Sequence, residues 1–345
     1  MQQMCTVVAA GLTAVLSLAA CSRAVNPVGG GGSVSPAPAS PRASSSASAG
    51  TASRPLAPLT GLPAASAATA GRPAVALDLA GPDPSGLTSA DVVFQEFSSP
   101  VRYVAVFQSK QATAGPVTGA QPTDKQALSV LHPLLGYDGA AAPSFITSLD
   151  KSKVVKDAGY TDHPSLYTTG TQGPIASTKA ITNAVTGQTA PPPLFQYRGA
   201  ISGADTLAAT GVSRPTSAHV TIPGYGTEYW AFSPQHDSWE LTSGGPRVRV
   251  ANVVVQMVSY KSIGINRRAG LSAQVAQVIG GGRAEVLSSS APGGSGGTAA
   301  SGVWSKPHLK DVTSYVETSG SLMAFQPGPT WIILAPPGTQ VSTSG

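Results

Sequence analysis

Hydrophobic residues along the chain form short runs, separated by segments rich in glycine and proline. In the first half after residue 55, apolar or alternating runs with valine and phenylalanine predict strands over 74–79, 92–97, 103–108 and 134–137. Leucines at helical spacing after Pro122 predict a helix that Thr123 or Asp124 caps and that Pro133 ends. Two further helices are predicted over 143–149 and 173–185.

The pattern changes after about residue 216, where valine-rich runs alternate with glycine and proline clusters. These runs predict strands over 248–260, 274–279, 284–287, 301–304, 322–325 and 330–334. Their spacing fits an antiparallel sheet folded on itself. We therefore predict an α+β fold, with an N-terminal mixed α/β subdomain over 56–198 and a mostly antiparallel β subdomain over 199–341.

The N-terminus has a different pattern: residues 1–20 carry no charge and contain an apolar run over 7–20. This run is short for a membrane span and typical of a signal-peptide core, although no Lys or Arg precedes it. It ends in Leu18-Ala19-Ala20-Cys21, the lipobox pattern of bacterial lipoproteins. The alternatives are an ordinary secretory signal or a short membrane helix with an incidental cysteine. We predict cleavage after a signal peptide over 1–20, lipidation of Cys21, and anchoring on the extracytoplasmic face of the cell membrane.

Composition and charge favour a linker between this anchor and the folded part. Residues 22–55 are almost entirely Ala, Gly, Pro, Ser, Thr and Val, which predicts a disordered, lipid-anchored linker over 21–55. The chain carries a net charge of +5, and three linker arginines leave only +2 for the rest. Membrane lipid, through acylated Cys21, is therefore a nearer partner than nucleic acid. Because Cys5 leaves with the signal peptide, the mature chain is expected to have neither a disulfide nor a thiol nucleophile.

Many short segments after the linker resemble the YerB-like lipoproteins, a family of exported proteins with a domain of unknown function. The resemblance rests on PLTGL (58–62), RPAVA (72–76), SGL (85–87), ADVV (90–93) with Glu96, RY (102–103), AVFQS (105–109), GPV (115–117), Ala120 with PTD (122–124), HP (163–164), LYT (166–168), PPLF (192–195), ANVVVQ (251–256), GVWSKP (302–307) and PGPTW (327–331). It implies two subdomains and a membrane-anchored location, but no known activity.

Three positions depart from the family pattern. Members usually carry arginines at the positions of Thr118 and Gln121, and often an asparagine at that of Ser165. Two guanidinium groups beside Asp124 suit either an anionic ligand or an internal ion-pair network. Their loss here therefore indicates either an altered anion site or a neutral, hydrogen-bonded replacement of a structural cluster.

No segment predicts a specific chemistry. The sequence GGSGG over 293–297 formally matches a nucleophile elbow, but it lies in a glycine/serine loop without a following helix. The five histidines are isolated, so we predict no metal site and no cofactor. We expect Asp91 to cap a turn and Glu96 to pair with Arg102. The four tryptophans are expected in the core, with a surface sugar or peptide platform as the alternative.

The candidate ligand-binding residues are Arg102, Asp124, Tyr167, His163 and Glu96, centred on the loop over 115–124. The leading hypothesis is a non-enzymatic binding or interaction module of the cell envelope, with a glycan, a peptide or a protein as partner. The alternative is a cell-wall-directed enzyme such as a glycan or peptidoglycan hydrolase. That alternative requires Asp124, Asp91, Glu96 or His163 to converge in one cleft.

Overall fold

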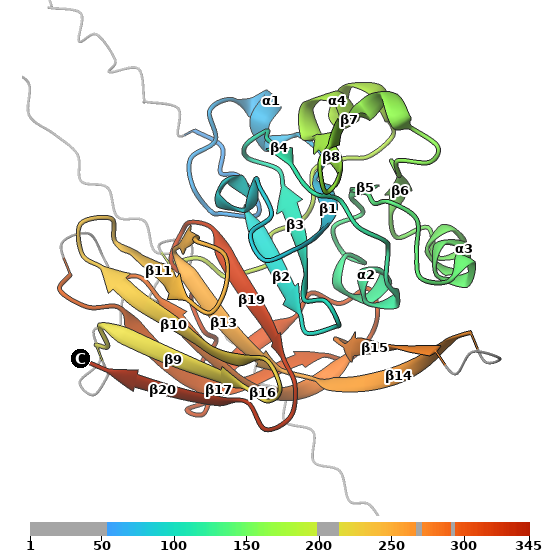
Figure 1. Ribbon diagram of the computed structural model, residues 1–345. Helices are drawn as coiled ribbons and strands as arrows, with labels where there is room; N and C mark the ends of the chain where they lie inside the picture. The colour runs from blue at the N-terminus through green and yellow to red at the C-terminus, as the bar shows by residue number, and fades with distance from the viewer. Residues whose placement is uncertain (1–53, 199–213, 267–270, 291–293) are drawn as a thin grey trace, which may run out of the picture. The chain divides into compact units, whose positions relative to one another are not determined.

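A computed structural model describes residues 54–198, 214–266, 271–290 and 294–345 of the chain. The predicted signal peptide, Cys21 and nearly all of the predicted linker lie outside these ranges, as does Gly293. The described part is mostly β, with few and short helices (Figure 1). No helix among the described residues is long and apolar enough to cross a membrane.

Ten strands form one mixed sheet to which both halves of the chain contribute. Their order is β18 (Ser314–Glu317), β17 (Thr298–Lys306), β16 (Gly280–Ser288), β13 (Asn252–Met257), β19 (Thr330–Ala335), β2 (Val92–Glu96), β3 (Arg102–Phe107), β1 (Val75–Ala80), β5 (Leu134–Gly136) and β6 (Lys156–Asp157). The halves meet where β19 pairs in parallel with β2 on one side and with β13 on the other. The predicted boundary near residue 198 therefore does not separate two sheets.

The remaining strands form three smaller sheets. A five-stranded antiparallel sheet has the order β12 (Arg249–Val250), β11 (Ser238–Ser243), β10 (Gly226–Ser233), β9 (Ser217–Ile222) and β20 (Gln340–Ser344). A ribbon pairs β14 (Ser259–Asn266) with β15 (Leu271–Gln277). The third sheet has the order β4 (Thr113–Ala114), β8 (Gly173–Ser177) and β7 (Tyr167–Gly170).

Among the described residues, all helices belong to the part before residue 198. They are α1 (Ala67–Ala70), α2 (Pro122–Ala127), α3 (Pro143–Ser152) and α4 (Thr178–Ala184), with 3-10 turns η1 (Leu87–Ser89) and η2 (Pro164–Leu166). Helix α2 begins after Gln121, and the carboxylate of Asp124 accepts a hydrogen bond from the Gln121 N–H. Asp124 therefore caps this helix from its third position, as in a capping box.

Both faces of the large sheet are covered, which explains its continuous apolar runs. Along β19, Trp331 and Ile333 face one buried cluster, while Ile332 and Leu334 face the other. The first cluster also contains Trp230 and other side chains of the five-stranded sheet. All four tryptophans are at most 2% exposed, so the alternative of a surface tryptophan platform is wrong.

Three predicted elements differ from the structure. The first part of the predicted helix over 173–185 is strand β8, because Gly173 has a φ of 141° and Pro174 lacks the N–H of a helix interior. Residues 322–325 form only isolated bridges. The run over 248–260 divides into parts of β12, β13 and β14, with breaks at Ala251 and Val258.

A hydrogen-bonded chain of buried side chains connects the five-stranded sheet to the large sheet. Trp331 Nε1 donates to Gln95 Oε1 at 2.8 Å, and Gln95 Nε2 donates to Glu228 Oε1 at 2.5 Å. The other oxygen of Glu228 accepts from Trp230 Nε1 at 3.2 Å. Glu228 is 2% exposed, and burial raises its pKa to about 7 because the charged form loses its hydration. This sheet contact therefore contains a group that titrates near neutral pH.

Candidate functional site

Three of the predicted site residues meet in a buried cluster around the guanidinium of Arg102. Arg102 Nε lies 2.6 Å from Glu96 Oε2, and Nη1 lies 2.7 Å from Asp78 Oδ1. Nη2 donates to Asp124 Oδ1. Strand register places Glu96 opposite Arg102, and Asp78 lies two residues before Ala80, which is also paired with Arg102. The alternation of side chains along the strands therefore directs all three groups to the sheet face that α2 covers.

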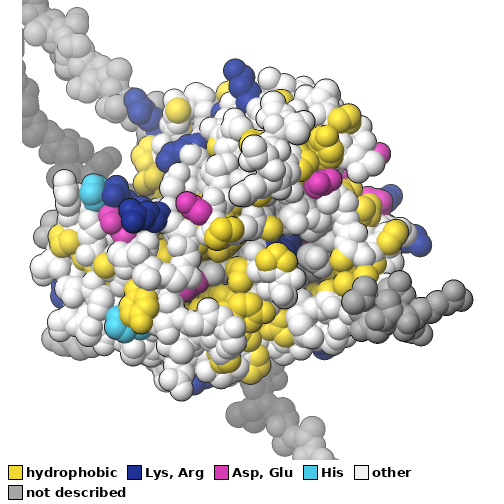
Figure 2. Space-filling view, in the orientation of Figure 1, with side chains coloured by type: hydrophobic (Ala, Val, Ile, Leu, Met, Phe, Trp, Pro, Cys, Tyr) yellow, Lys and Arg dark blue, Asp and Glu magenta, His cyan; other side chains and the backbone are white. Residues whose placement is uncertain are grey.

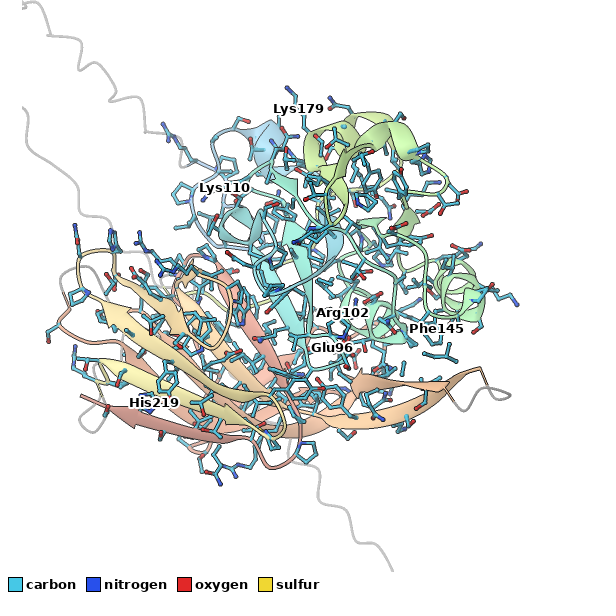
Figure 3. The ribbon with its side chains drawn as sticks, in the orientation of Figure 1. Glu96, Arg102, Lys110, Phe145, Lys179 and His219 are labelled. Atoms are coloured by element: carbon cyan, nitrogen blue, oxygen red, sulfur yellow. The ribbon has the colours of Figure 1, made fainter. Side chains whose placement is uncertain are left out.

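Helix α2 and the β14–β15 ribbon complete the hydrogen bonds of this cluster. Thr123 Oγ1 donates to Glu96 Oε1, and the Ala276 N–H donates to the same oxygen at 2.9 Å. Gln121 N–H donates to Asp124 Oδ2 at 2.6 Å. Figure 3 shows Arg102 and Glu96 side by side beneath strand β3. The cluster thus joins strands of the first half to a ribbon of the second half.

The charges of this Arg102 cluster do not balance if all three carboxyls are ionised. Burial, and then the negative charge of Asp124, raise the pKa of Asp78 well above its ordinary value. The three carboxylates raise the pKa of Arg102 despite its burial, so it stays charged. Asp78 Oδ2 has no hydrogen-bond partner among the described residues. Burial therefore favours the neutral form of Asp78 over its carboxylate.

The structure does not bring the five candidate ligand-binding residues together at one open surface. Arg102, Glu96 and Asp124 are at most 2% exposed, and no solvent-open surface leads to their charged atoms within the described ranges. Tyr167 lies in the hydrophobic cluster that contains Trp331 and Ile333, and its hydroxyl donates to the Ala158 carbonyl. His163 is half-exposed, with its Nε2 4.0 Å from Asp157 Oδ2. The five residues therefore do not form one binding site.

The structural roles predicted for two carboxylates are confirmed. Asp91 is buried at the end of η1, and its Oδ2 accepts from the N–H groups of Gln108 and Ser109 at 2.6 Å each. Glu96 pairs with Arg102 as expected. The loop over 115–124 packs into the core around Val117, Ala120 and Thr123, and it does not line the five best-formed pockets of the described residues.

We expect Asp78→Asn to gain stability relative to the parent protein as the pH rises above about 4. A raised folded-state pKa gives stability that is complete below the unfolded pKa and is lost as the pH rises through the folded one. The amide imitates the neutral carboxyl and has no proton to lose. Urea unfolding of both proteins at several pH values measures this difference. Asp138→Asn, at an exposed site, is the control, and equal destabilisation by Asp78→Asn at all pH values would contradict the assignment.

A solvent-open groove of about 830 Å³ lies elsewhere, between the two halves of the chain. Residues of the first half line one wall: Leu62, Thr88 and Lys110. The other wall comes from the second half, over 236–238, 240–242, 247–251 and 327–329. Figure 2 shows basic side chains gathered beside a histidine and acidic side chains at the upper end of the five-stranded sheet. A volume of this size is typical of ligand sites.

The alternation of buried and exposed side chains along one segment explains why two arginines face this groove. Val248 and Val250 are buried, so the alternating neighbours Arg247 and Arg249 point to solvent. Arg249 lies opposite Glu240 in the β11–β12 pair, and its Nε is 2.8 Å from Glu240 Oε1. The turn before them requires Gly244, which has a φ of 91° and whose Cβ would lie 2.3 Å from the Thr227 carbonyl oxygen.

The other charged groups of the groove are unequally paired. Glu240 also lies 3.4 Å from His236 Nδ1, and Asp237 accepts a hydrogen bond from Ser290. Lys110 and Arg247 are exposed, and no carboxylate of the described ranges lies within 4.0 Å of their nitrogens. Sequence reasoning missed this groove. The Arg-Val-Arg-Val alternation was a usable signal, but only the fold brings Lys110 to the opposite wall.

The described part of the chain has a mostly β fold, which is built around a mixed ten-stranded sheet. The chain belongs to the DUF3048 family. The model of its N-terminal domain, described as a protein of unknown function, matches residues 59–189, and that of its C-terminal domain matches residues 225–332. The family prediction is therefore confirmed.

A solved structure shares the fold. The crystal structure of the YerB protein from Bacillus subtilis superposes with a TM-score of 0.64 at 18% sequence identity, over 84% of this chain and 100% of that one. At this identity the likeness concerns the fold alone. No curated protein matches the chain.

Proposed function

We propose that this protein is a membrane-anchored lipoprotein that acts as a binding module on the extracytoplasmic side of the cell envelope. Its N-terminal part would form a mixed α/β region and its C-terminal part a mostly antiparallel one, in keeping with the α+β description. The observation that carries the binding role is the open groove of about 830 Å³ between the two halves, with polar and charged side chains on its walls.

The N-terminal sequence supports the location. An uncharged apolar run ends in small residues directly before Cys21, and a cysteine at that position supplies the thiol for lipid attachment. The segment from Ser22 to residue 53 is long enough and polar enough to hold a folded part away from a bilayer. The groove would then be available to components of the envelope.

The residues named for a hydrolase argue against the enzyme alternative. Asp124 and Glu96 bind Arg102, Asp91 caps a turn, and His163 lies at the surface beside Asp157. They do not converge in a cleft within the described ranges. We therefore favour the binding module over the hydrolase.

We expect Cys21→Ser to move the protein from the membrane fraction to the soluble extracytoplasmic fraction, because the acceptor of the lipid is lost. Fractionation with immunoblotting, together with labelling by a radioactive fatty acid, measures both effects. Cys5→Ser is the matched control and should remain membrane-bound and labelled. Membrane retention and labelling of Cys21→Ser would contradict the anchor.

The binding role has its own test. The full chain with Cys21→Ser, freed from the membrane, should sediment with isolated cell envelopes in a saturable manner. A protein that stays in the supernatant at all envelope concentrations would contradict the proposed function.

A further inference from the structure

We propose that the groove between the two halves binds an extended polyanion, a chain that carries repeated phosphate or carboxylate groups. This inference rests on the proposed function, and it assigns the chemistry of the ligand. The observation behind it is the pair of exposed cations, Lys110 and Arg247, that the two walls contribute and that no carboxylate of the described ranges neutralises within 4.0 Å.

The local charges favour an anion over a cation. Three permanent cations line the groove, and one of them, Arg249, is already paired with Glu240. The second acid, Asp237, accepts a hydrogen bond from Ser290. Lys110 and Arg247 are therefore the charges left free for a ligand. Guanidinium and ammonium groups bind phosphate and carboxylate oxygens through charge-assisted hydrogen bonds.

The form of the groove favours a chain over a compact ligand. Its lining is divided between Leu62, Thr88 and Lys110 on one wall and the β11–β12 hairpin on the other. Pro327–Pro329 lies beside both, because the Gly328 N–H donates to the Thr60 carbonyl and the Ala251 N–H donates to the Pro329 carbonyl. Because the two unpaired cations stand on different walls, a chain with repeated charges can engage both at once. The lining contains no Trp, Tyr or Phe, so it offers no aromatic face on which neutral sugar rings could stack. Recognition must therefore rely mainly on charge.

The test compares two double variants of the full chain in the Cys21→Ser background. Lys110→Gln with Arg247→Gln removes the two groove cations. Lys179→Gln with Lys261→Gln removes two exposed lysines from α4 and β14, outside the groove, and is the matched control. The probe is a short, fluorescently labelled inorganic polyphosphate, and its affinity is measured by anisotropy at several salt concentrations. Inorganic monophosphate and phosphatidylglycerol vesicles are the parallel arms.

We expect the groove variant to bind polyphosphate at least about tenfold more weakly than the parent, and the control variant to bind within about twofold of it. The slope of log affinity against log salt should decrease by about 1.5 in the groove variant, as for two lost phosphate contacts. Monophosphate should compete only weakly. Circular dichroism and thermal unfolding should be unchanged, because both substituted side chains are exposed.

Three outcomes would overturn the proposal. The first is equal weakening in the two double variants, which would indicate general charge attraction. The second is binding to phosphatidylglycerol vesicles without binding to polyphosphate, which would identify a lipid surface as the ligand. The third is no polyphosphate binding by the parent. If the protein still sediments with cell envelopes in that case, the proposed binding function is retained and only the assignment of a polyanion as its ligand is rejected.

Discussion

Replacing Arg102 by methionine is expected to lower the free energy of unfolding by about 3–5 kcal/mol, the range seen when one partner of a buried ion pair is removed. Methionine has a similar length and fills the space, so the loss comes from charge. Glu96 and Asp124 would remain 0–1% exposed without their guanidinium, and only Thr123 and backbone N–H groups would still stabilise them. Urea unfolding followed by circular dichroism measures the change.

Two comparisons make this result specific. Arg249→Met, which removes a half-exposed pair with Glu240, should cost at most about 1 kcal/mol. Adding Glu96→Gln and Asp124→Asn to Arg102→Met should recover part of the loss, because the uncompensated charges are then gone. An Arg102→Met protein that is as stable as Arg249→Met would refute a stabilising role for the Arg102 cluster.

Glu228 is expected to make the stability of the protein depend on pH near neutrality. Its folded-state pKa of about 7 lies above the ordinary value of 4.5, so the stability it allows is complete below about pH 4 and is lost as the pH rises through 7. Through this group alone, the free energy of unfolding should be about 3 kcal/mol lower at pH 8 than at pH 4. The cause is the cost of burying a carboxylate without a cation.

Glu228→Gln should remove this dependence. The free energy of unfolding of the variant should rise relative to that of the parent protein between pH 5 and pH 8, as measured by urea unfolding at fixed salt. Glu317→Gln, a half-buried glutamate of β18, is the control and should leave the pH profile unchanged. A constant difference between Glu228→Gln and the parent across this range would show that Glu228 is not the titrating group.

Much of the sheet could be predicted because its central strands are buried on both faces. The runs that contain β2, β3 and β19 are mainly apolar and rich in Val, Ile and Phe, and their bounds agree with prediction to within a residue or two. The ten-stranded order could not be predicted, because the pairing of β19 with β2 joins residues more than 200 positions apart. Local pattern also failed at Gly173 and Pro174, where a hairpin with β7 and the pairing of β8 with the distant β4 made a strand from an apparent helix start.

The candidate site shows the same limit. Pairing of Glu96 with Arg102 follows from two neighbouring strands, but Asp78 and Asp124 join them only through the folded sheet and α2. The sequence also carries no sign that the four groups lack access to solvent. Nothing in the sequence distinguishes Lys110 and Arg247 from other surface residues. Only the folded arrangement of the two halves places them on opposite walls of the groove.

The position of β19 has a consequence for the order in which the protein can be assembled. A chain delivered from its N-terminus, during synthesis or during export, presents β2 and β13 long before residues Thr330–Ala335. Until then each of the two strands has one unpaired edge, and the halves of the large sheet are not connected. β19 is the last strand of the large sheet along the chain, so the sheet can be completed only after residues 330–335 have been delivered.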